Sequence, residues 1–318
     1  MPSNQPPAGV AVFGEALIDV IPTGDVNFEG RAGGSPANIA VAAARLGLPT
    51  TFLGGLSTDR WGQLLTTHLE AAGVATDAAP RSERPTAMAL VDLAEDGSAT
   101  YRFLWEDTAD RVVELDDLPD DLGAATWLQV GSVAAAFADT GAVAAALVTR
   151  ERQRRLVACD PNVRTMVHGT GQEVRDRLLA LVEQADLVKS SDEDLELLLG
   201  DIAIEDAIRH LLASGAGLVA VTRGGDGAIL GSAAGMVTID PVDTTLVDTV
   251  GAGDTFMAGL LVGLADLGVR TRQDLRGLDL ESLRAVGTMA ATAAAITVSR
   301  QGANPPTRDD MPPGTLVA

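Results

Sequence analysis

Short apolar runs alternate with longer helical patterns along most of this chain of 318 residues. Most of the runs are apolar at every position, as expected of parallel strands that are covered on both faces. The expected strands are Val10–Phe13, Thr51–Leu53, Trp127–Val130, Leu156–Ala158, Leu187–Val188 and Leu218–Val221. The expected helices between them are Pro36–Leu46, Trp61–Ala72, Thr140–Thr149, Glu173–Gln184 and Ile204–Leu212. This order predicts an α/β fold, with a doubly wound, mostly parallel sheet and helices on both faces.

The helix at 36–46 carries boundary signals at both ends. Ser35 is a good N-cap residue, Pro36 suits the first helical position, and Gly47 favours a stop directly after the helix. We therefore expect this helix to begin immediately after Ser35.

Two extended segments interrupt the alternation of strands and helices. Thr86–Asp92 and Thr100–Trp105 are strand-like and are joined by a turn signal at 94–97, and the run at 21–31 is an excursion with turn residues. We expect them to pair into a small β lid over one edge of the site, although an ordinary surface hairpin has the same pattern. The expected division is a core at 10–20, 34–83 and 114–304 with a lid at 21–33 and 84–113.

The composition disfavours several classes of partner. A formal net charge of -21 and an isoelectric point near 4.3 oppose binding to nucleic acid and to anionic membranes. No apolar stretch reaches the roughly 20 residues that span a bilayer, and residues 1–9 lack the pattern of a secretory signal. Cys159 is the only cysteine, so no internal disulfide can form, which suits a reducing compartment. We expect a cytoplasmic protein.

The most specific pattern is Asp248-Thr249-Val250-Gly251-Ala252-Gly253-Asp254-Thr255-Phe256, which leads into an apolar helix at 257–267. The glycines at 251 and 253 allow a tight turn in which backbone N–H groups converge at the helix N-terminus, a place that favours anions. A carboxylate is costly in such a place unless it has a task. Asp254 is therefore a candidate base that accepts the proton of a hydroxyl while the N–H groups hold a transferred phosphoryl group.

Three other interpretations compete with this one. The dinucleotide-binding fingerprint requires glycine or alanine where Phe256 stands, and it follows the first strand of a fold. The Walker pattern ends in Gly-Lys-Ser/Thr, and the only lysine, Lys189, lies elsewhere. A glycine-rich helix cap with a solvated aspartate stays open as the alternative.

A second glycine pair, Gly33-Gly34, opens the helix that carries Asn38. Glycine lets a ligand approach the backbone closely, and the amide of Asn38 offers both a donor and an acceptor to neighbouring hydroxyl groups. Asp19 follows the first strand, so we expect it at the carboxyl edge of the sheet, where ligands bind in such folds. Each signal is weak alone, and together with the 248–256 motif they become a strong indication of a binding site for hydroxyl groups beside the candidate base.

These residues resemble those of the ribokinase-like, PfkB-type family of carbohydrate kinases, most of all its bacterial fructokinases. The resemblance runs from about residue 10 to 302, and the two family signatures match at 32–47 and 248–256. It implies that Asp254 is the catalytic base and that the amides of Gly251, Ala252 and Gly253 form an anion hole. The sugar-binding residues that it implies are Asp19, Gly33, Gly34 and Asn38.

The resemblance extends to two further segments. Arg164, in Asp160-Pro161-Asn162-Val163-Arg164, matches a position that faces the transferring phosphate, with a surface ion pair as the alternative. The loop at 222–227 resembles the strand end that lies against the nucleotide, with a plain turn as the alternative. Its implied nucleotide contacts are Thr222, Gly224, Gly225 and Gly227.

The lid also matches the family. Tyr101, Phe103 and Trp105 correspond to a cover over the sugar, although aromatic residues in paired strands equally serve packing. Lid strands in such proteins can pair between subunits, so the resemblance implies a homodimer through the lid as one arrangement.

Departures from the family pattern concern the metal ions and the sugar. Ser191 and Asp194 stand where the family often has Asn-x-x-Glu, so the carboxylate implied to organise Mg2+ through water is shorter; a charged helix start explains these residues equally. Leu17 stands where ribokinases tend to have a polar residue, which favours a substrate other than ribose. Asp248 and the carbonyl of Val250 match a monovalent-cation site, which implies K+.

The resemblance implies ATP-dependent phosphorylation of a primary hydroxyl of a small sugar, most of all fructose, with ATP and Mg2+. A nucleoside kinase of the same fold stays open, as does a kinase for ribose or 2-keto-3-deoxygluconate. A non-catalytic sugar-binding regulator is less favoured, because a binding protein has no use for a base at Asp254.

Overall fold

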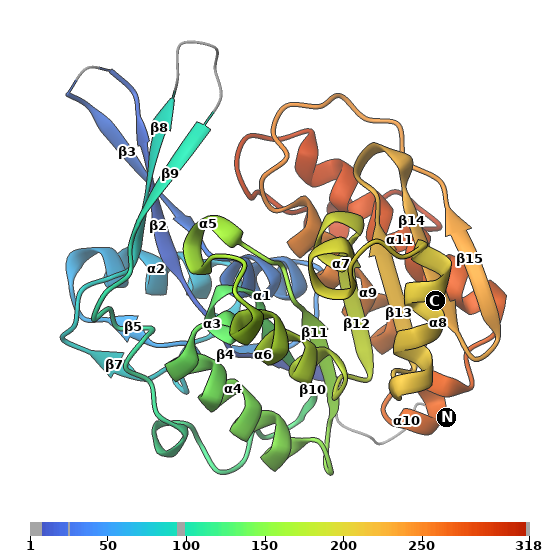
Figure 1. Ribbon diagram of the computed structural model, residues 1–318. Coiled ribbons are helices and arrows are strands. Elements are labelled where there is room, and N and C mark those ends of the chain that lie inside the picture. Colours follow the sequence, from blue (N-terminus) through green and yellow to red (C-terminus); the bar gives the residue numbers. More distant parts are fainter. Residues whose placement is uncertain (1–7, 25, 94–98, 316–318) are drawn as a thin grey trace.

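A nine-stranded sheet forms the centre of the computed structural model, which describes residues 8–24, 26–93 and 99–315 (Figure 1). In spatial order its strands are β15 (Gly235–Ile239), β14 (Ala228–Ser232), β13 (Leu218–Thr222), β12 (Leu187–Ser191), β11 (Leu156–Asp160), β10 (Ala125–Gly131), β1 (Gly9–Val12), β4 (Thr50–Phe52) and β6 (Val74–Ala75). Neighbouring strands from β13 to β6 are parallel, and β14 and β15 continue the sheet in antiparallel pairs.

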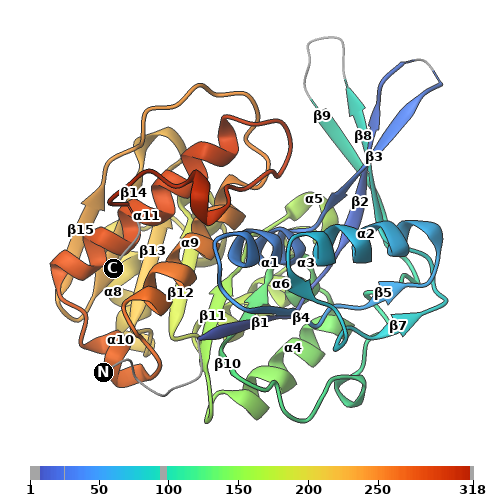
Figure 2. The ribbon, with the colours of Figure 1, turned by 180° about the vertical axis from the view of Figure 1, so that it is seen from behind.

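Helices cover both faces of this sheet, as Figures 1 and 2 show from opposite sides. One face carries α1 (Ser35–Arg45), α2 (Arg60–Ala71), α9 (Ala252–Asp266), α10 (Arg272–Arg276) and α11 (Leu280–Val298). The other carries α3 (Ser132–Ala136), α4 (Ala138–Glu151), α6 (Gln172–Val182), α7 (Asp192–Leu199) and α8 (Ile204–Ser214). Each face has its own buried apolar cluster against the sheet. The predicted doubly wound α/β fold is confirmed.

A second sheet projects from the carboxyl edge of the first (Figure 1). Its strands, in spatial order, are β3 (Phe28–Gly33), β2 (Leu17–Pro22), β8 (Met88–Leu93) and β9 (Ala99–Leu104). A shorter pair, β5 (Leu56–Ser57) and β7 (Arg81–Ser82), lies nearby, and α5 (Thr165–His168) lies beside the base of the projecting sheet. The predicted lid-like sheet is therefore present, and we call it the lid sheet; the turn expected at 94–97 lies outside the described residues.

The start of α1 differs from the expectation. The helix begins at Ser35 itself, its N-cap is Gly34 with φ 99, and Pro36 takes the second helical position. Ser35 is the first helical residue and not the cap, and its hydroxyl donates to Asp254 on another helix. The end is as expected, since Gly47 follows the last turn with φ +91, a left-handed conformation that favours glycine.

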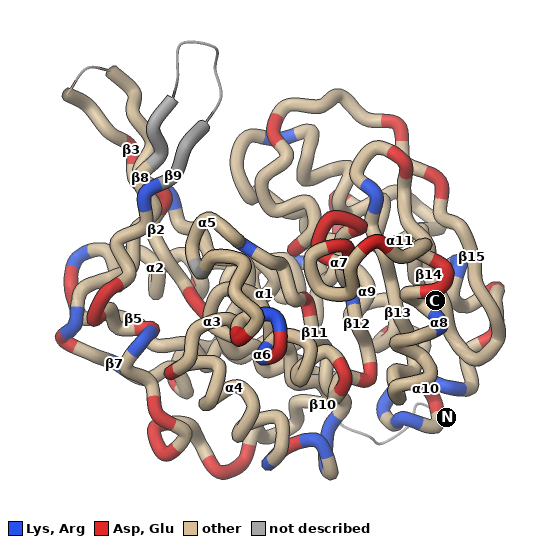
Figure 3. The backbone as a smooth tube through the Cα atoms, in the orientation of Figure 1, with Lys and Arg blue, Asp and Glu red and all other residues tan. Residues whose placement is uncertain are grey.

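Charge is distributed over the whole fold (Figure 3). Acidic residues lie on helices and loops alike, with a run at the start of α7 formed by Asp192, Glu193 and Asp194. Within the described part of the chain, no helix combines the length and apolar content that crossing a bilayer requires.

Candidate active site

The turn before α9 places backbone N–H groups at one point. Gly251 adopts a left-handed conformation with φ 79, and a Cβ there would lie 2.7 Å from Cβ of Ala303, so glycine is required twice over. The helix begins at Ala252, whose N–H donates to the carbonyl of Thr249 over 3.3 Å. The N–H groups of Gly253 and Asp254 belong to the first turn, where no helical acceptor exists. With the helix dipole, they form a place suited to an anion.

Asp254 is held by two side chains from α1. Ser35 Oγ donates to Oδ1 of Asp254 over 2.6 Å, and Asn38 Nδ2 donates to Oδ2 over 2.9 Å. The carboxylate is 9% exposed, so it is nearly enclosed while remaining reachable. Asn38 was expected to contact the sugar, and the structure places its amide on the candidate base. The sequence predicts Ser35 only as a helix cap, because its position gives no sign of a contact 219 residues away.

Asp19 lies on β2, beside the glycine pair. A Cβ at Gly33 would lie 2.3 Å from Oδ2 of Asp19, so a larger residue would displace this carboxylate. Burial raises the pKa of Asp19 to about 6, and the facing Arg31 opposes the rise. Gly34, with φ +99, would place a Cβ 2.7 Å from the carbonyl oxygen of Glu15, so the backbone itself requires glycine.

A buried ion pair lies next to the turn. Lys189 Nζ donates to Oδ2 of Asp160 over 2.9 Å, and a Cβ at Gly253 would lie 2.9 Å from the same Nζ. Burial raises the pKa of Asp160 to about 6 against the opposing effect of Lys189, whose own pKa rises because of its carboxylate neighbours despite burial. Both groups are therefore charged at neutral pH. Lys189 belongs to no sequence motif, and its being the sole lysine is the only signal that points to it.

The segment that carries Arg164 is fixed by a chain of hydrogen bonds. Asn162, with φ 39, donates through Nδ2 to Oγ of Ser132 over 3.0 Å, and Ser132 donates to Oε1 of Glu15 over 2.6 Å. Arg164 follows at the exposed start of α5, and its Nη1 donates to the carbonyl of Val163 over 3.1 Å. The fold thus brings Arg164 to the edge of the sheet where β2 begins.

Asp194 and Ser191 form the start of α7. Ser191 Oγ accepts from the N–H of Asp194 over 3.0 Å, and the carboxylate accepts from the N–H groups of Ser191 and, over 2.9 Å, of Val163. This is the capping arrangement of a charged helix start. Each carboxylate oxygen has two lone pairs, so these residues also fit a water-bound Mg2+.

The loop after β13 is open at two of its glycines. A Cβ at Gly224 or Gly225 would meet no heavy atom within 4 Å, which leaves space beside the loop. Gly227 differs, because a Cβ there would lie 2.1 Å from the carbonyl oxygen of Ile239, so the strand turn requires this glycine. Thr222, at the end of β13, donates to the carbonyl of Ser190 over 3.4 Å.

Trp105 anchors the base of the lid sheet. It is 6% exposed, and its Nε1 donates to Oδ2 of Asp110 over 2.5 Å. Its ring lies 5.6 Å from that of Phe103 and 5.7 Å from that of Phe137 on the core. Trp105 therefore serves packing, the alternative that the sequence left open, whereas the side chain of Tyr101 lies outside the described residues.

Asp248 ties the loop before the turn to the chain that follows α11. Its Oδ1 accepts from the N–H of Val250 over 3.0 Å, and its Oδ2 accepts from the N–H of Gly302 over 2.8 Å. Val250 is 45% exposed at the same turn. The two residues expected to hold a monovalent cation are thus adjacent.

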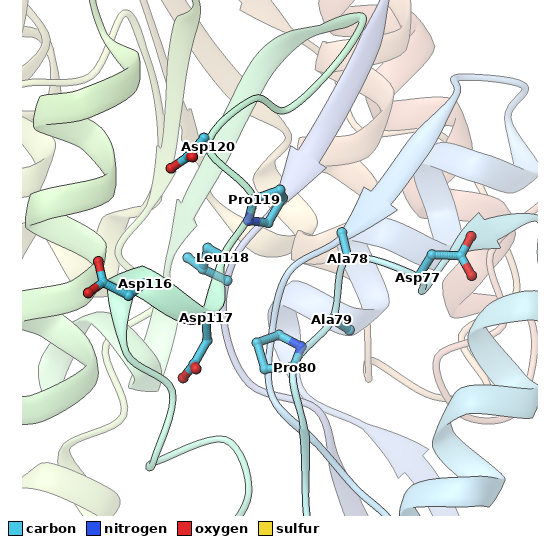
Figure 4. A pocket seen from close by; sticks show the side chains of 9 residues that line it. All are labelled: Asp77, Ala78, Ala79, Pro80, Asp116, Asp117, Leu118, Pro119 and Asp120. Atoms are coloured by element: carbon cyan, nitrogen blue, oxygen red, sulfur yellow. The ribbon is translucent and has the colours of Figure 1, made fainter.

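A pocket of about 510 Å3 lies away from these residues (Figure 4). The segments 77–80 and 116–120 line it, and four of the lining residues are aspartates. Figure 4 shows the Asp77 side chain directed away from the facing segment, so the carboxylates do not converge. None of the residues around Asp254 lines this pocket. We place the candidate site at the turn before α9, where a base and free N–H groups meet.

A family model described as pfkB family carbohydrate kinase matches residues 8–310. The chain belongs to this family. As a pfkB-family member it is an enzyme, a carbohydrate kinase that transfers phosphate to a sugar. The predicted membership is confirmed by a match that spans nearly the whole chain.

Three relatives of this pfkB-family kinase are fructokinases. The fructokinase of Rhizobium leguminosarum bv. trifolii is 37% identical over 278 residues, which cover 85% of this chain and 84% of that protein. A crystal structure of fructokinase with bound ATP from Xylella fastidiosa has a TM-score of 0.87 and 30% identity, covering 96% of this chain and 95% of that one. Fructokinase from Vibrio cholerae O395 in fructose, ADP and calcium ion bound form has a TM-score of 0.81 and 28% identity, covering 93% and 94%.

Proposed function

We propose that this kinase uses ATP to phosphorylate a primary hydroxyl of fructose, with Asp254 as the general base. The observation that carries the proposal is the Asp254 carboxylate, fixed by Ser35 and Asn38 at the open N-terminus of α9. A base fixed beside free N–H groups can take a proton from a hydroxyl while those groups hold the phosphoryl being transferred.

The sugar binds between Asp19 and Asp254. Asp19 and the backbone at Gly33 and Gly34 hold its hydroxyl groups, and the amide oxygen of Asn38 offers one further acceptor. The primary hydroxyl then lies within reach of Asp254, which removes its proton as the oxygen attacks in line. Phe103 and Tyr101 are the lid residues that we assign to the cover.

ATP binds along the opposite side of the turn, with its terminal phosphate at the amides of Gly251, Ala252 and Gly253. The open space beside Gly224 and Gly225 supports a nucleotide there. Leu246 and Val247, 66% and 57% exposed on the loop before the turn, offer apolar surface to a base. The remaining residues assigned to the nucleotide are Thr222, Gly227 and Ser191.

Charge at the phosphates is offset by further groups. Arg164 faces the phosphate, and Asp194 organises Mg2+ through water. Asp194 would hold the water ligands of this ion, which would supply positive charge to offset that of the phosphates. Asp248 and the Val250 carbonyl hold a monovalent cation such as K+ beside the turn.

We assign the lid to 21–33 and 84–113 and the core to 10–20, 34–83 and 114–304, so that β2 begins in the core and ends in the lid. The lid closes over the core. Closure excludes water and so limits the hydrolysis of ATP. Exposed apolar side chains on the lid, Val26 at 82%, Phe28 at 62% and Leu104 at 48%, support a homodimer in which two lid sheets meet.

The decisive experiment measures ATP consumption with fructose, other hexoses, ribose, 2-keto-3-deoxygluconate and nucleosides. We expect the highest kcat/KM with fructose. A higher value with a nucleoside, with ribose or with 2-keto-3-deoxygluconate would replace fructose by that acceptor. Silence with every acceptor, in a protein that unfolds cooperatively, would instead indicate the sugar-binding regulator.

A further inference from the structure

Lys189 is the only lysine of a chain whose other basic residues are arginines and three histidines. It lies on β12, is 4% exposed, and pairs with Asp160, which is 1% exposed at the end of β11. Taking two charges out of water is costly, and apolar residues of similar volume often stabilise a fold equally well. Stability alone is therefore a weak reason for this pair.

The space around the ammonium explains why lysine occupies this position. A Cβ at Gly253 would lie 2.9 Å from Lys189 Nζ, so the ammonium rests directly against the turn that begins α9. A guanidinium is larger and planar, so an arginine here would need more space than the ammonium occupies. A side chain at residue 253 would have to displace this ammonium.

Negative charge surrounds this ammonium. The carboxylates of Asp160, Asp194 and Asp254 all act on it electrostatically, and Asp160 takes its hydrogen bond. These three carboxylates come from three different elements, β11, α7 and α9, which meet at the turn. A phosphate that binds at the same turn adds further negative charge. The ammonium beneath Gly253 therefore lowers the repulsion between this phosphate and the three carboxylates.

We propose that Lys189 is a positioning residue for phosphoryl transfer: its buried ammonium holds the 251–254 turn and offsets the charge of Asp254 and of the phosphate bound there. The inference rests on the proposed function. Asp160 keeps the ammonium in place under the turn.

The test separates the charge from the stability of the pair. Lys189→Met removes the ammonium but leaves Asp160 as an unpaired buried charge, so this variant is expected to lose stability as well. In Lys189→Met/Asp160→Asn both charges are gone, so the melting temperature should recover. We expect kcat of this double variant to stay lower than wild type by about tenfold to 100-fold, with KM for fructose nearly unchanged.

Arg155 supplies a matched control. It is a buried cation, 9% exposed, paired with the fully buried Glu151 over 2.9 Å, and it precedes β11, whereas Asp160 ends that strand. Arg155→Met should lower the melting temperature and leave kcat of the folded protein at the wild-type value.

A second measurement is independent of turnover. Calorimetric titration with ATP should give a weaker Kd for the double variant, because the lost ammonium lies closer to the turn than the carboxylate of Asp160 that is removed with it. Equal kcat and equal ATP affinity, within about twofold of wild type, would overturn the role of Lys189. If the wild-type protein binds ATP but does not consume it with any of the sugars, the proposed function is contradicted. The comparison of ATP affinities would still decide the role of Lys189.

Discussion

At the scale of single residues, the candidate base depends on two partners. Ser35 and Asn38 donate to the two oxygens of Asp254, so the carboxylate has one orientation toward an incoming hydroxyl. Such charge-assisted hydrogen bonds are stronger than neutral ones. The base is therefore oriented before a substrate binds, and the two residues that orient it belong to α1.

Asp254→Asn should lower kcat by about 10²- to 10⁴-fold, because an amide cannot accept the proton of the hydroxyl. KM for the sugar should change little, since the amide has nearly the same shape. Steady-state kinetics with fructose and ATP provide the check. Asp266→Asn, at the far end of α9 where Asp266 pairs with Arg308, should retain normal kcat. Near-normal turnover in Asp254→Asn would refute the assignment.

At the scale of elements, the strands and helices of the core were predictable because each is a continuous local pattern. The lid was less so, since β2 pairs with β8 about 70 residues later, and no local pattern specifies that register. The antiparallel strands β14 and β15 were not expected, because glycines interrupt their apolar runs. The contacts of Ser35 and Asn38 with Asp254 span 219 and 216 residues, so only the packing of α1 on α9 reveals them.

The segment between β1 and β2 contains a buried acid, Glu15, at 2% exposure. Its carboxyl accepts from Ser132 Oγ over 2.6 Å and from the N–H of Ala134 over 3.0 Å, which joins the base of the lid sheet to α3. Burial raises the pKa of Glu15 from 4.5 to about 7, and the nearby Asp110 adds to the rise. Between these values the unfolded chain releases a proton that the folded protein keeps, so stability falls as pH rises from 4.5 to about 7.

Glu15→Gln removes this titration. The free energy of unfolding of the variant minus that of wild type should therefore rise by about 2 kcal/mol from pH 5 to pH 8, because only the wild type loses stability over this range. Urea unfolding at the two pH values measures the change. Glu83→Gln, at an exposed position, provides the control and should show the same difference at both values. A Glu15→Gln difference that does not vary with pH would contradict the raised pKa.

At the scale of the whole molecule, the lid sheet projects from the core and is not covered by it. Its edge strands are β3 and β9, and both carry exposed apolar side chains, Phe28 and Leu104. An edge strand with free backbone groups readily pairs with another chain. The proposed homodimer would cover this surface in both copies.

Phe28→Ser combined with Val26→Ser should convert the proposed dimer into a monomer, because it removes apolar surface from the proposed contact. Sedimentation at micromolar concentration measures the change. Leu280→Ser, at a 42% exposed apolar position on α11, should leave the dimer intact. A wild-type protein that sediments as a monomer would rule out the proposed contact.

Asp19 belongs to a strand of the lid sheet and not to a loop of the core, since β2 pairs with both β3 and β8. A ligand held by this carboxylate therefore contacts a hydrogen-bonded sheet of four strands. If Asp19 holds the sugar as proposed, the lid sheet determines both the choice of sugar and the closure of the site. Grafting the lid of a relative onto this core would then bring a new sugar preference and a new way of shutting the site in a single exchange.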